Sequence, residues 1–138
     1  MKVENAVYPK REQVEALLNL GGNAPITMLN LLKFKDEASY AEPDAPRISG
    51  RKAYMRYANA MRAIVEKAGG RFIFSSTIDA LVVGEVDELW DMAAIVEYPS
   101  RAAFAEITRS PEVLAIGVHR QAGLAGQLLI QCTQQTAA

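Results

Sequence analysis

Apolar residues recur along this chain at helical spacing in some segments and in short continuous runs in others. After Pro9, the segment KREQVEALLNLGG places Val14, Leu17 and Leu18 on one side of a helix and then reaches a double glycine, which favours the end of a helix. This pattern predicts a short N-terminal helix.

The most regular helical stripe lies in residues 49–70, SGRKAYMRYANAMRAIVEKAGG. Ser49 is suited to cap the first turn, and the double glycine of Gly69 and Gly70 is suited to end the helix. The stripe consists of Ala53, Tyr54, Tyr57, Ala60, Met61, Ile64, Val65 and Ala68. Two shorter helices are predicted nearer the C-terminus, in SRAAFAEITR and from SPE onwards, each with a serine at its N-cap.

Apolar runs bounded by turn residues predict the strands. ITMLNLLKF, residues 26–34, and WDMAAIVEYP, residues 90–99, are each expected to form a strand, and the last strand is expected over residues 127–133. Between the first two, RFIFSSTI and ALVVGE are interpreted as one strand with an irregularity around Asp79 or as two short strands. Residues 35–49 contain two prolines and are expected to form a long surface loop. This loop either covers a site or is extra length that the fold tolerates without a function.

The order of these elements from residue 26 onwards is strand, helix, two strands, a helix pair and strand. This βαββαβ order predicts an α+β fold, a ferredoxin-like sandwich with helices on one face of an antiparallel sheet. The other face needs a cover that the rest of the chain does not supply, so we expect a homodimer formed through the sheet faces. In this division, residues 1–24 are an N-terminal helical extension, residues 25–133 form the sandwich domain, and residues 134–138 are a fraying tail.

Composition narrows the expected partners and location. The chain has 138 residues, and its 15 basic and 16 acidic side chains give a formal net charge of −1, which offers no field to attract nucleic acid or an anionic membrane. No apolar run approaches the roughly 20 residues that a membrane-spanning helix requires. A single cysteine and a start without an apolar signal sequence favour the reducing cytoplasm.

Several motifs, taken together and in order, resemble those of one protein family. They are MLNLLKFK (28–35), SGRKAYMRY (49–57), GGR (69–71), WDMAAIVEYPSRAAFAEI (90–107), SPE (110–112) and HRQAGL (119–124). Over residues 25–131 the chain resembles the family called domain of unknown function 1330, in the dimeric α+β barrel superfamily. The resemblance implies a ferredoxin-like dimer but no established reaction. Relatives in that superfamily include cofactor-independent monooxygenases, haem-degrading monooxygenases and muconolactone isomerases, which tend to place the site between the sheet and the helices.

Two residues on the predicted strands are candidates for lining a pocket. Asn30 is an amide within an apolar strand and needs a hydrogen-bond partner there. Strand alternation places Trp90 on the same face as the large apolar residues of its strand. Either Asn30 bonds a neighbouring backbone group and Trp90 fills the core, or the two residues line a pocket together.

The long predicted helix and its ends carry further candidates. Tyr54 and Tyr57 lie three residues apart on the buried stripe, so they either pack in the core or anchor a ligand beneath the helix. Arg71 follows the double glycine and either caps the helix or points into the pocket. A basic cluster at the helix start is either a solvated face paired with acidic residues of the preceding loop or an anion site; it consists of Arg47, Arg51, Lys52 and Arg56.

His119 and Cys132 are the chain's only histidine and only cysteine. On a helical wheel the apolar residues after Val113 cluster in one direction and His119 lies nearly opposite, so His119 is expected to face solvent or the partner subunit. Arg120 lies at the flank of the apolar arc and is the better candidate to reach inward. Cys132 is expected to be an ordinary small residue of the last strand. A catalytic cysteine–histidine pair is therefore not expected, and the sequence shows neither metal-ligand spacing nor a reason to expect a cofactor.

These features leave three functions open. The first is a small-molecule binding protein or enzyme whose pocket uses some of the residues Asn30, Tyr54, Tyr57, Arg71, Trp90 and Arg120. Its ligand would be a small aromatic or carboxylate compound, and any reaction a cofactor-independent oxygenation or isomerisation. The second is a non-enzymatic dimeric interaction module, which an exposed apolar patch outside the dimer interface would favour. The third, haem degradation, needs a histidine turned into the pocket, which the helical wheel disfavours.

Overall fold

Helices and strands follow one another along the chain largely in the order that the sequence pattern predicts. In the computed structural model, which describes residues 1–20 and 22–135, the elements in chain order are α1 (Arg11–Asn19), β1 (Ile26–Phe34), α2 (Gly50–Lys67), β2 (Arg71–Thr77), β3 (Met92–Tyr98), α3 (Arg101–Thr108), α4 (Pro111–Gly123) and β4 (Leu124–Cys132). The predicted strand 26–34 and all four predicted helices are confirmed. β4 begins three residues before the predicted residue 127, directly after α4.

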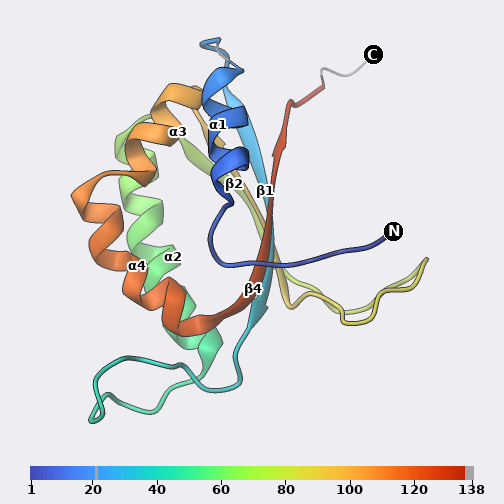
Figure 1. Cartoon of the computed structure of the whole chain (residues 1–138), viewed down its shortest axis with the longest axis vertical. Coiled ribbons are helices and arrows are strands. Elements are labelled where there is room, and N and C mark those ends of the chain that lie inside the picture. Colours follow the sequence, from blue (N-terminus) through green and yellow to red (C-terminus); the bar gives the residue numbers. More distant parts are fainter. Residues whose placement is uncertain (21, 136–138) are drawn as a thin grey trace.

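The strands form a four-stranded antiparallel sheet in the order β2-β3-β1-β4. Helices α2, α3 and α4 lie on one side of this sheet, and α1 lies beside α3 (Figure 1). The order of elements and strands is that of the ferredoxin-like α+β fold, which confirms the predicted fold class.

Serine side chains begin three of the helices, as the sequence predicts. The Oγ of Ser49 accepts a hydrogen bond from the backbone N–H of Lys52 at 3.0 Å, and the Oγ of Ser100 accepts one from Ala103 at 3.0 Å. Ser110 caps α4 in the same way, with Pro111 at the first helical position. Each cap satisfies a backbone donor that the helix itself leaves without a partner.

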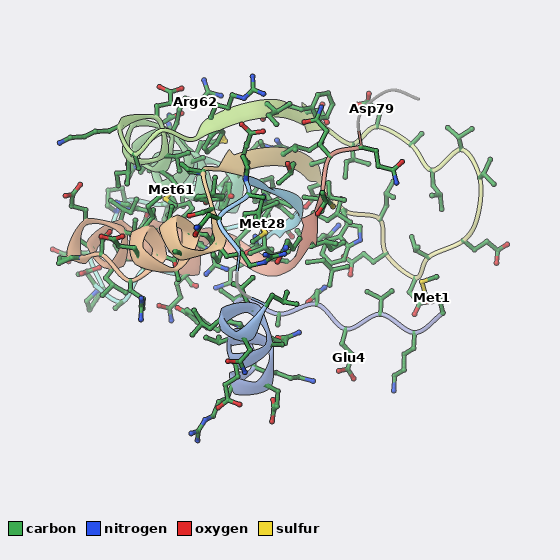
Figure 2. The ribbon with its side chains drawn as sticks, turned by 90° about the horizontal axis from the view of Figure 1, so that it is seen from above. Met1, Glu4, Met28, Met61, Arg62 and Asp79 are labelled. Atoms are coloured by element: carbon green, nitrogen blue, oxygen red, sulfur yellow. The ribbon has the colours of Figure 1, made fainter. Side chains whose placement is uncertain are left out.

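The strand register decides which side chains face the helices. In β1 the even-numbered residues Ile26, Met28, Leu32 and Phe34 are buried, and Ile26 and Leu32 lie opposite Tyr98 and Met92 of β3. Met28 packs in the same core cluster as Met61 of α2, and both lie within the body of the molecule (Figure 2). Asn30 lies on this same helix-facing side, opposite Ala94.

Two glycines allow α2 and α4 to touch backbone to backbone. A Cβ added to Gly123 would lie 2.4 Å from the carbonyl oxygen of Gly50 and 2.8 Å from the backbone nitrogen of Tyr54. A side chain at either position would therefore push the start of α2 away from the end of α4. This close contact sets the position of Tyr54, in the first turns of α2, relative to Arg120, in the last turn of α4.

The expectation of strand structure in ALVVGE is wrong. β2 ends at Thr77, and residues 78–91 form a long connection to β3 that departs from the open side of the sheet (Figure 1); Asp79 lies near its start (Figure 2). Val82 and Val83 in this connection are 90% and 86% exposed, because no neighbouring strand pairs with them. The irregularity of β2 is a register shift between Phe72 and Phe74 rather than at Asp79.

Residues of the sheet that point away from the helices form a largely apolar surface, which we call the open face. Its apolar part comprises Leu29, Leu31, Phe74, Ile95, Leu128 and Ile130, each on the side opposite the buried core residues, and the charged Arg71 and Glu97 point to the same side. Phe74 and Ile130 are 50% and 41% exposed. No element of the described chain covers this face (Figure 1).

The N-terminal helix α1 packs on the body of the fold through one of its three stripe residues. Leu17 contacts the core cluster, whereas Val14 and Leu18 remain exposed. Gly21, half of the double glycine predicted to end this helix, and residues 136–138 of the predicted fraying tail lie outside the described residues. Within the described part of the chain, no helix combines the length and the apolar character needed to cross a bilayer.

Candidate functional site

Three hydrogen-bonded side chains, Asn30, Gln127 and Arg120, lie between the sheet and α4 in surroundings that are otherwise apolar; we call them the polar chain. Gln127 of β4 donates from Nε2 to Oδ1 of Asn30 at 2.8 Å, and its Oε1 accepts a hydrogen bond from Nη2 of Arg120. Asn30 in turn donates from Nδ2 towards the carbonyl oxygens of Met28 and Ala94, at 3.3 and 3.4 Å. Gln127 is 8% exposed and is the one buried polar residue among the described part of the chain. The buried Gln127 thus finds partners in the half-buried Asn30 and Arg120 on either side of it.

Arg120 brings a positive charge to the end of this polar chain. Its Nη2 also donates to the carbonyl oxygen of Val7, and its guanidinium lies 5.7 Å from the centre of the Tyr8 ring. Among the described residues no carboxylate forms an ion pair with Arg120. A half-buried guanidinium with only neutral partners is unusual, because buried charges in proteins are normally paired.

The tyrosines of α2 lie within electrostatic reach of this cation. The rings of Phe34, Tyr54 and Tyr57 form a row with centre-to-centre distances of 5.5 and 5.6 Å. Burial raises the pKa of Tyr54 well above its ordinary value, and the neighbouring Tyr57 adds to this, whereas Arg120 acts in the opposite direction. Burial likewise raises the pKa of Tyr57, with Arg120 again opposing it. Both phenols therefore stay protonated at neutral pH and can act as hydrogen-bond donors.

Neither tyrosine hydroxyl has a hydrogen-bond partner among the described residues. Every fully enclosed side-chain nitrogen or oxygen of the described residues has a hydrogen-bond partner. Because the hydroxyls of Tyr54 and Tyr57 have none, they are not fully enclosed and remain within reach of water. A phenol in such a position is free to bond a ligand.

The open space beside Tyr54 is small. A cavity of about 30 Å³ lies between α2, β2 and β3, enough for about one or two water molecules. It is lined by Tyr54, Met55, Ala58, Asn59, Arg62, Phe72, Ser75, Met92 and Ala94. This cavity is too small for an aromatic compound, and Tyr54 is the one candidate residue in its lining.

The structure brings four of the six candidate residues together and separates two. Asn30, Tyr54, Tyr57 and Arg120 approach one another between the sheet, α2 and α4. Trp90 precedes β3, where it is half-buried and packs against neither core cluster.

Arg71 lies on the other side of the sheet. Its Nε donates to Oε1 of Glu97 at 3.0 Å, and the pairing of these two residues in β2 and β3 places both side chains away from the helices. Arg71 therefore does not reach the interior.

Gln127 is the member of this group that was not predicted. The predicted strand began at this residue, which left its direction unassigned. A glutamine among the apolar residues of LAGQLLIQC is nevertheless a signal of the same kind as Asn30, because a buried amide needs partners.

His119 takes no part in the polar chain. Its Nδ1 lies 2.7 Å from the hydroxyl oxygen of Tyr40, in the long loop. The expectation that His119 faces solvent or a partner subunit is incomplete, because the loop folds over α4 and leaves the imidazole half-buried. An open groove of about 410 Å³ lies beside this pair, lined by Tyr40, Glu42, Asp44, Ala45, Pro46, Arg56, Val118 and His119.

The remaining candidates have ordinary surroundings. Arg47 pairs with Glu37 at 3.6 Å on the surface, and Arg51 lies 4.8 Å from the ring centre of Phe34. Cys132 is a free, half-buried thiol whose sulfur faces the carbonyl oxygen of Ile130. In the part of the chain that the structure describes, no three His, Cys, Asp or Glu side chains gather as metal ligands do.

Comparisons with known proteins agree with this fold. The family described as "Domain of unknown function (DUF1330)" matches residues 40–131. A protein of unknown function from Rhodopseudomonas palustris, RPA0582, is similar over its whole length, with 30% identity, a TM-score of 0.86 and coverage of 97% of this chain and 100% of that chain. The methylated form of RPA0582 gives 31% identity, the same TM-score of 0.86 and coverage of 96% of both chains.

More distant structures share the fold alone. SnoaB, a cofactor-independent oxygenase from Streptomyces nogalater, has 13% identity and a TM-score of 0.53, with 83% of this chain and 96% of that chain covered. A hydroxynitrile lyase from Passiflora edulis has 11% identity and a TM-score of 0.53, with 85% and 100% covered. No curated protein is similar enough to this chain to count as a match.

Proposed function

Because this chain belongs to the DUF1330 family, whose function is unknown, we propose a function from its own side chains: it binds a small aromatic or carboxylate compound between the sheet and the helices. One observation carries the proposal. The half-buried Arg120, which has no carboxylate partner among the described residues, lies near two tyrosine hydroxyls that have no hydrogen-bond partner there. Mainly apolar sites with a few convergent polar groups are typical of small-molecule binding.

The chemistry of these groups supports the ligand class. An arginine side chain can bind both oxygens of a carboxylate, and a protonated phenol can donate to one of them. The row of Phe34, Tyr54 and Tyr57 offers ring faces and edges to an aromatic group. If the compound is turned over, we propose a cofactor-independent oxygenation or isomerisation. The similar folds of SnoaB and the hydroxynitrile lyase support an enzymatic use of this architecture without assigning either reaction to this chain.

Binding of this kind can be tested with the purified protein. Native mass spectrometry of the protein as isolated detects a retained compound, and calorimetry with benzoate as the probe measures affinity directly. We expect Tyr54→Phe to weaken binding roughly fivefold, the usual effect of losing one hydrogen bond, and Asn30→Leu to weaken it through Gln127 and Arg120. Tyr40→Phe is the matched control, because it removes a phenol hydroxyl that lies outside this site. No bound compound and no benzoate binding in repeated preparations would contradict the proposal.

The proposed working form is a homodimer in which two open faces pack together. The apolar character of the open face supports this, because such a surface is costly to leave in water. Ile130→Glu places a charge on that face, whereas Leu129→Glu places it on the neighbouring residue of β4, which points to the other side. Ile130 and Leu129 have side chains of the same size and are similarly exposed, at 41% and 47%. Light scattering after gel filtration should show monomers for Ile130→Glu and dimers for Leu129→Glu; dimers for both would refute this interface.

A non-enzymatic interaction module is the second candidate, and one observation favours it. The connection between β2 and β3 exposes Leu81, Val82, Val83 and Val86 at 44%, 90%, 86% and 48%. Apolar residues exposed together in this way often mark a contact with another protein. The proposed location is the cytoplasm, which suits a cysteine that forms no disulfide.

A further inference from the structure

The guanidinium of Arg120 uses only part of its bonding capacity. Among the described residues, one of its nitrogens, Nη2, makes two hydrogen bonds, to Gln127 Oε1 and to the carbonyl oxygen of Val7. A guanidinium has five N–H groups in a planar fork that matches a carboxylate. Both present acceptors are neutral, although charged acceptors make hydrogen bonds with arginine that are about twice as strong. Arg120 therefore holds a neutral oxygen at a place suited to an anionic one.

The neutral oxygen comes from the chain's own N-terminal segment, residues 5–8. This segment crosses β4 on its way to α1 (Figure 1). Val7 is half-buried and packs against the core cluster that contains Leu32, Tyr54 and Leu124. Its apolar side chain and its carbonyl thus occupy the two kinds of space that a small organic carboxylate needs: an apolar contact beside Tyr54 and an oxygen position on Arg120.

Besides the contacts of Val7 and the Tyr8 ring, which lies 5.7 Å from the Arg120 guanidinium, two further contacts hold this segment in place among the described residues. The backbone N–H of Ala6 donates to the carbonyl oxygen of Gln127 at 3.1 Å, as an isolated bridge rather than a continuous strand pairing. Asn5 packs against Gly126, where a Cβ would lie 2.2 Å from its Oδ1. Asn5, Ala6 and Tyr8 are exposed, as are the residues before them. Met1 and Glu4, which precede the segment, lie on an extended stretch at the outside of the molecule (Figure 2).

We propose that residues 5–8 are an internal, displaceable occupant of a carboxylate site, and that a small organic carboxylate enters by taking the place of the Val7 carbonyl on Arg120. This inference rests on the proposed small-molecule function and adds both the anchoring group and the means of access. Gln127 positions Arg120 for either occupant, because its Oε1 accepts from the same guanidinium.

The test compares two valine substitutions in the full chain. Val7→Ser removes the apolar anchor of the segment and leaves its backbone intact, whereas Val3→Ser makes the same change at an exposed position, 50% accessible. Because the segment competes with the ligand, loosening it should tighten the binding of benzoate roughly fivefold in Val7→Ser, with no change in Val3→Ser. Arg120→Gln should weaken benzoate binding at least about tenfold, and Arg120→Lys, which keeps the charge without the fork, should have an intermediate effect.

Hydrogen–deuterium exchange reports the segment itself. Saturating benzoate should increase exchange in the peptide that contains Ala6, whose N–H is then released from Gln127. If benzoate binding depends on Arg120 but the segment stays protected and Val7→Ser leaves the affinity unchanged, displacement is refuted while the proposed function stands. If Tyr54→Phe weakens benzoate binding and Arg120→Gln does not, the carboxylate site on Arg120 and the displacement are both refuted, and only binding beside Tyr54 remains of the proposed function. If benzoate binds neither the wild type nor Val7→Ser, both are refuted for this ligand class.

Discussion

Replacing Asn30 and Gln127, singly and together, tests whether the polar chain acts as one unit. Gln127→Met removes the amide that donates to Asn30 Oδ1 at 2.8 Å and leaves that oxygen without its partner. Asn30→Leu leaves Gln127 Nε2 without an acceptor in a position that is 8% exposed. An unmatched buried polar group costs about 1 to 3 kcal/mol, so each single change should lower the free energy of unfolding by about that amount. The double variant keeps neither amide, and its loss should be smaller than the sum by about 1 to 2 kcal/mol.

Urea unfolding followed by circular dichroism measures all four proteins, with linear extrapolation to the free energy of unfolding in water. The control pairs Asn30→Leu with Ser49→Ala, a change at the distant cap of α2 whose effect should simply add. If Asn30→Leu and Gln127→Met are also additive to within about 0.5 kcal/mol, the two amides are energetically independent and do not act as one unit.

Three further predictions concern the frame around the site. Ser49→Ala should lower the free energy of unfolding by about 1 kcal/mol, because Lys52 loses its capping acceptor, and urea unfolding of Ser49→Asp should show most of it restored. Gly123→Ala should cost about 1 to 3 kcal/mol because its Cβ meets the Gly50 carbonyl at 2.4 Å, whereas Gly117→Ala, with no neighbouring atom within 4 Å, should be neutral or slightly stabilising; equal thermal stability of the two variants would count against the close helix contact. Burial raises the pKa of Tyr54, Tyr57 and Tyr98 above the ordinary 10.0. The unfolded chain therefore loses these protons first, and stability should fall above about pH 10 by up to ~1.4 kcal/mol per pH unit for each tyrosine. Urea titrations of Tyr54→Phe should show a shallower fall, and an unchanged slope would contradict this assignment.

Much of the candidate site could be predicted because its residues are marked by local pattern. Tyr54 and Tyr57 follow from the helical period of α2, and the inward direction of Arg120 follows from the wheel of α4. Asn30 stood out as an amide in an apolar strand, and the structure supplies its partner. Each of these inferences depends only on residues within a few positions of one another.

Trp90 illustrates where such local reasoning stops. The chain turns at Asp91, whose backbone N–H donates to the Leu32 carbonyl and whose Oδ2 accepts from the N–H of Phe34 at 2.9 Å. β3 therefore begins only at Met92, and strand alternation does not extend back to Trp90. The ALVVGE segment failed for a related reason, since β-branched residues favour a strand only where a neighbouring strand is available to pair.

The sequence by itself determined the helices, their serine caps, the strand β1 and the βαββαβ order, because these depend on side-chain period and on backbone donors within one turn. Only the tertiary structure decided which polar groups meet. Gln127 and Asn30 are 97 positions apart, and Arg120 and Val7 are 113 positions apart. Such contacts depend on strand register and on the path of a terminal segment across β4, and neither leaves a period in the sequence.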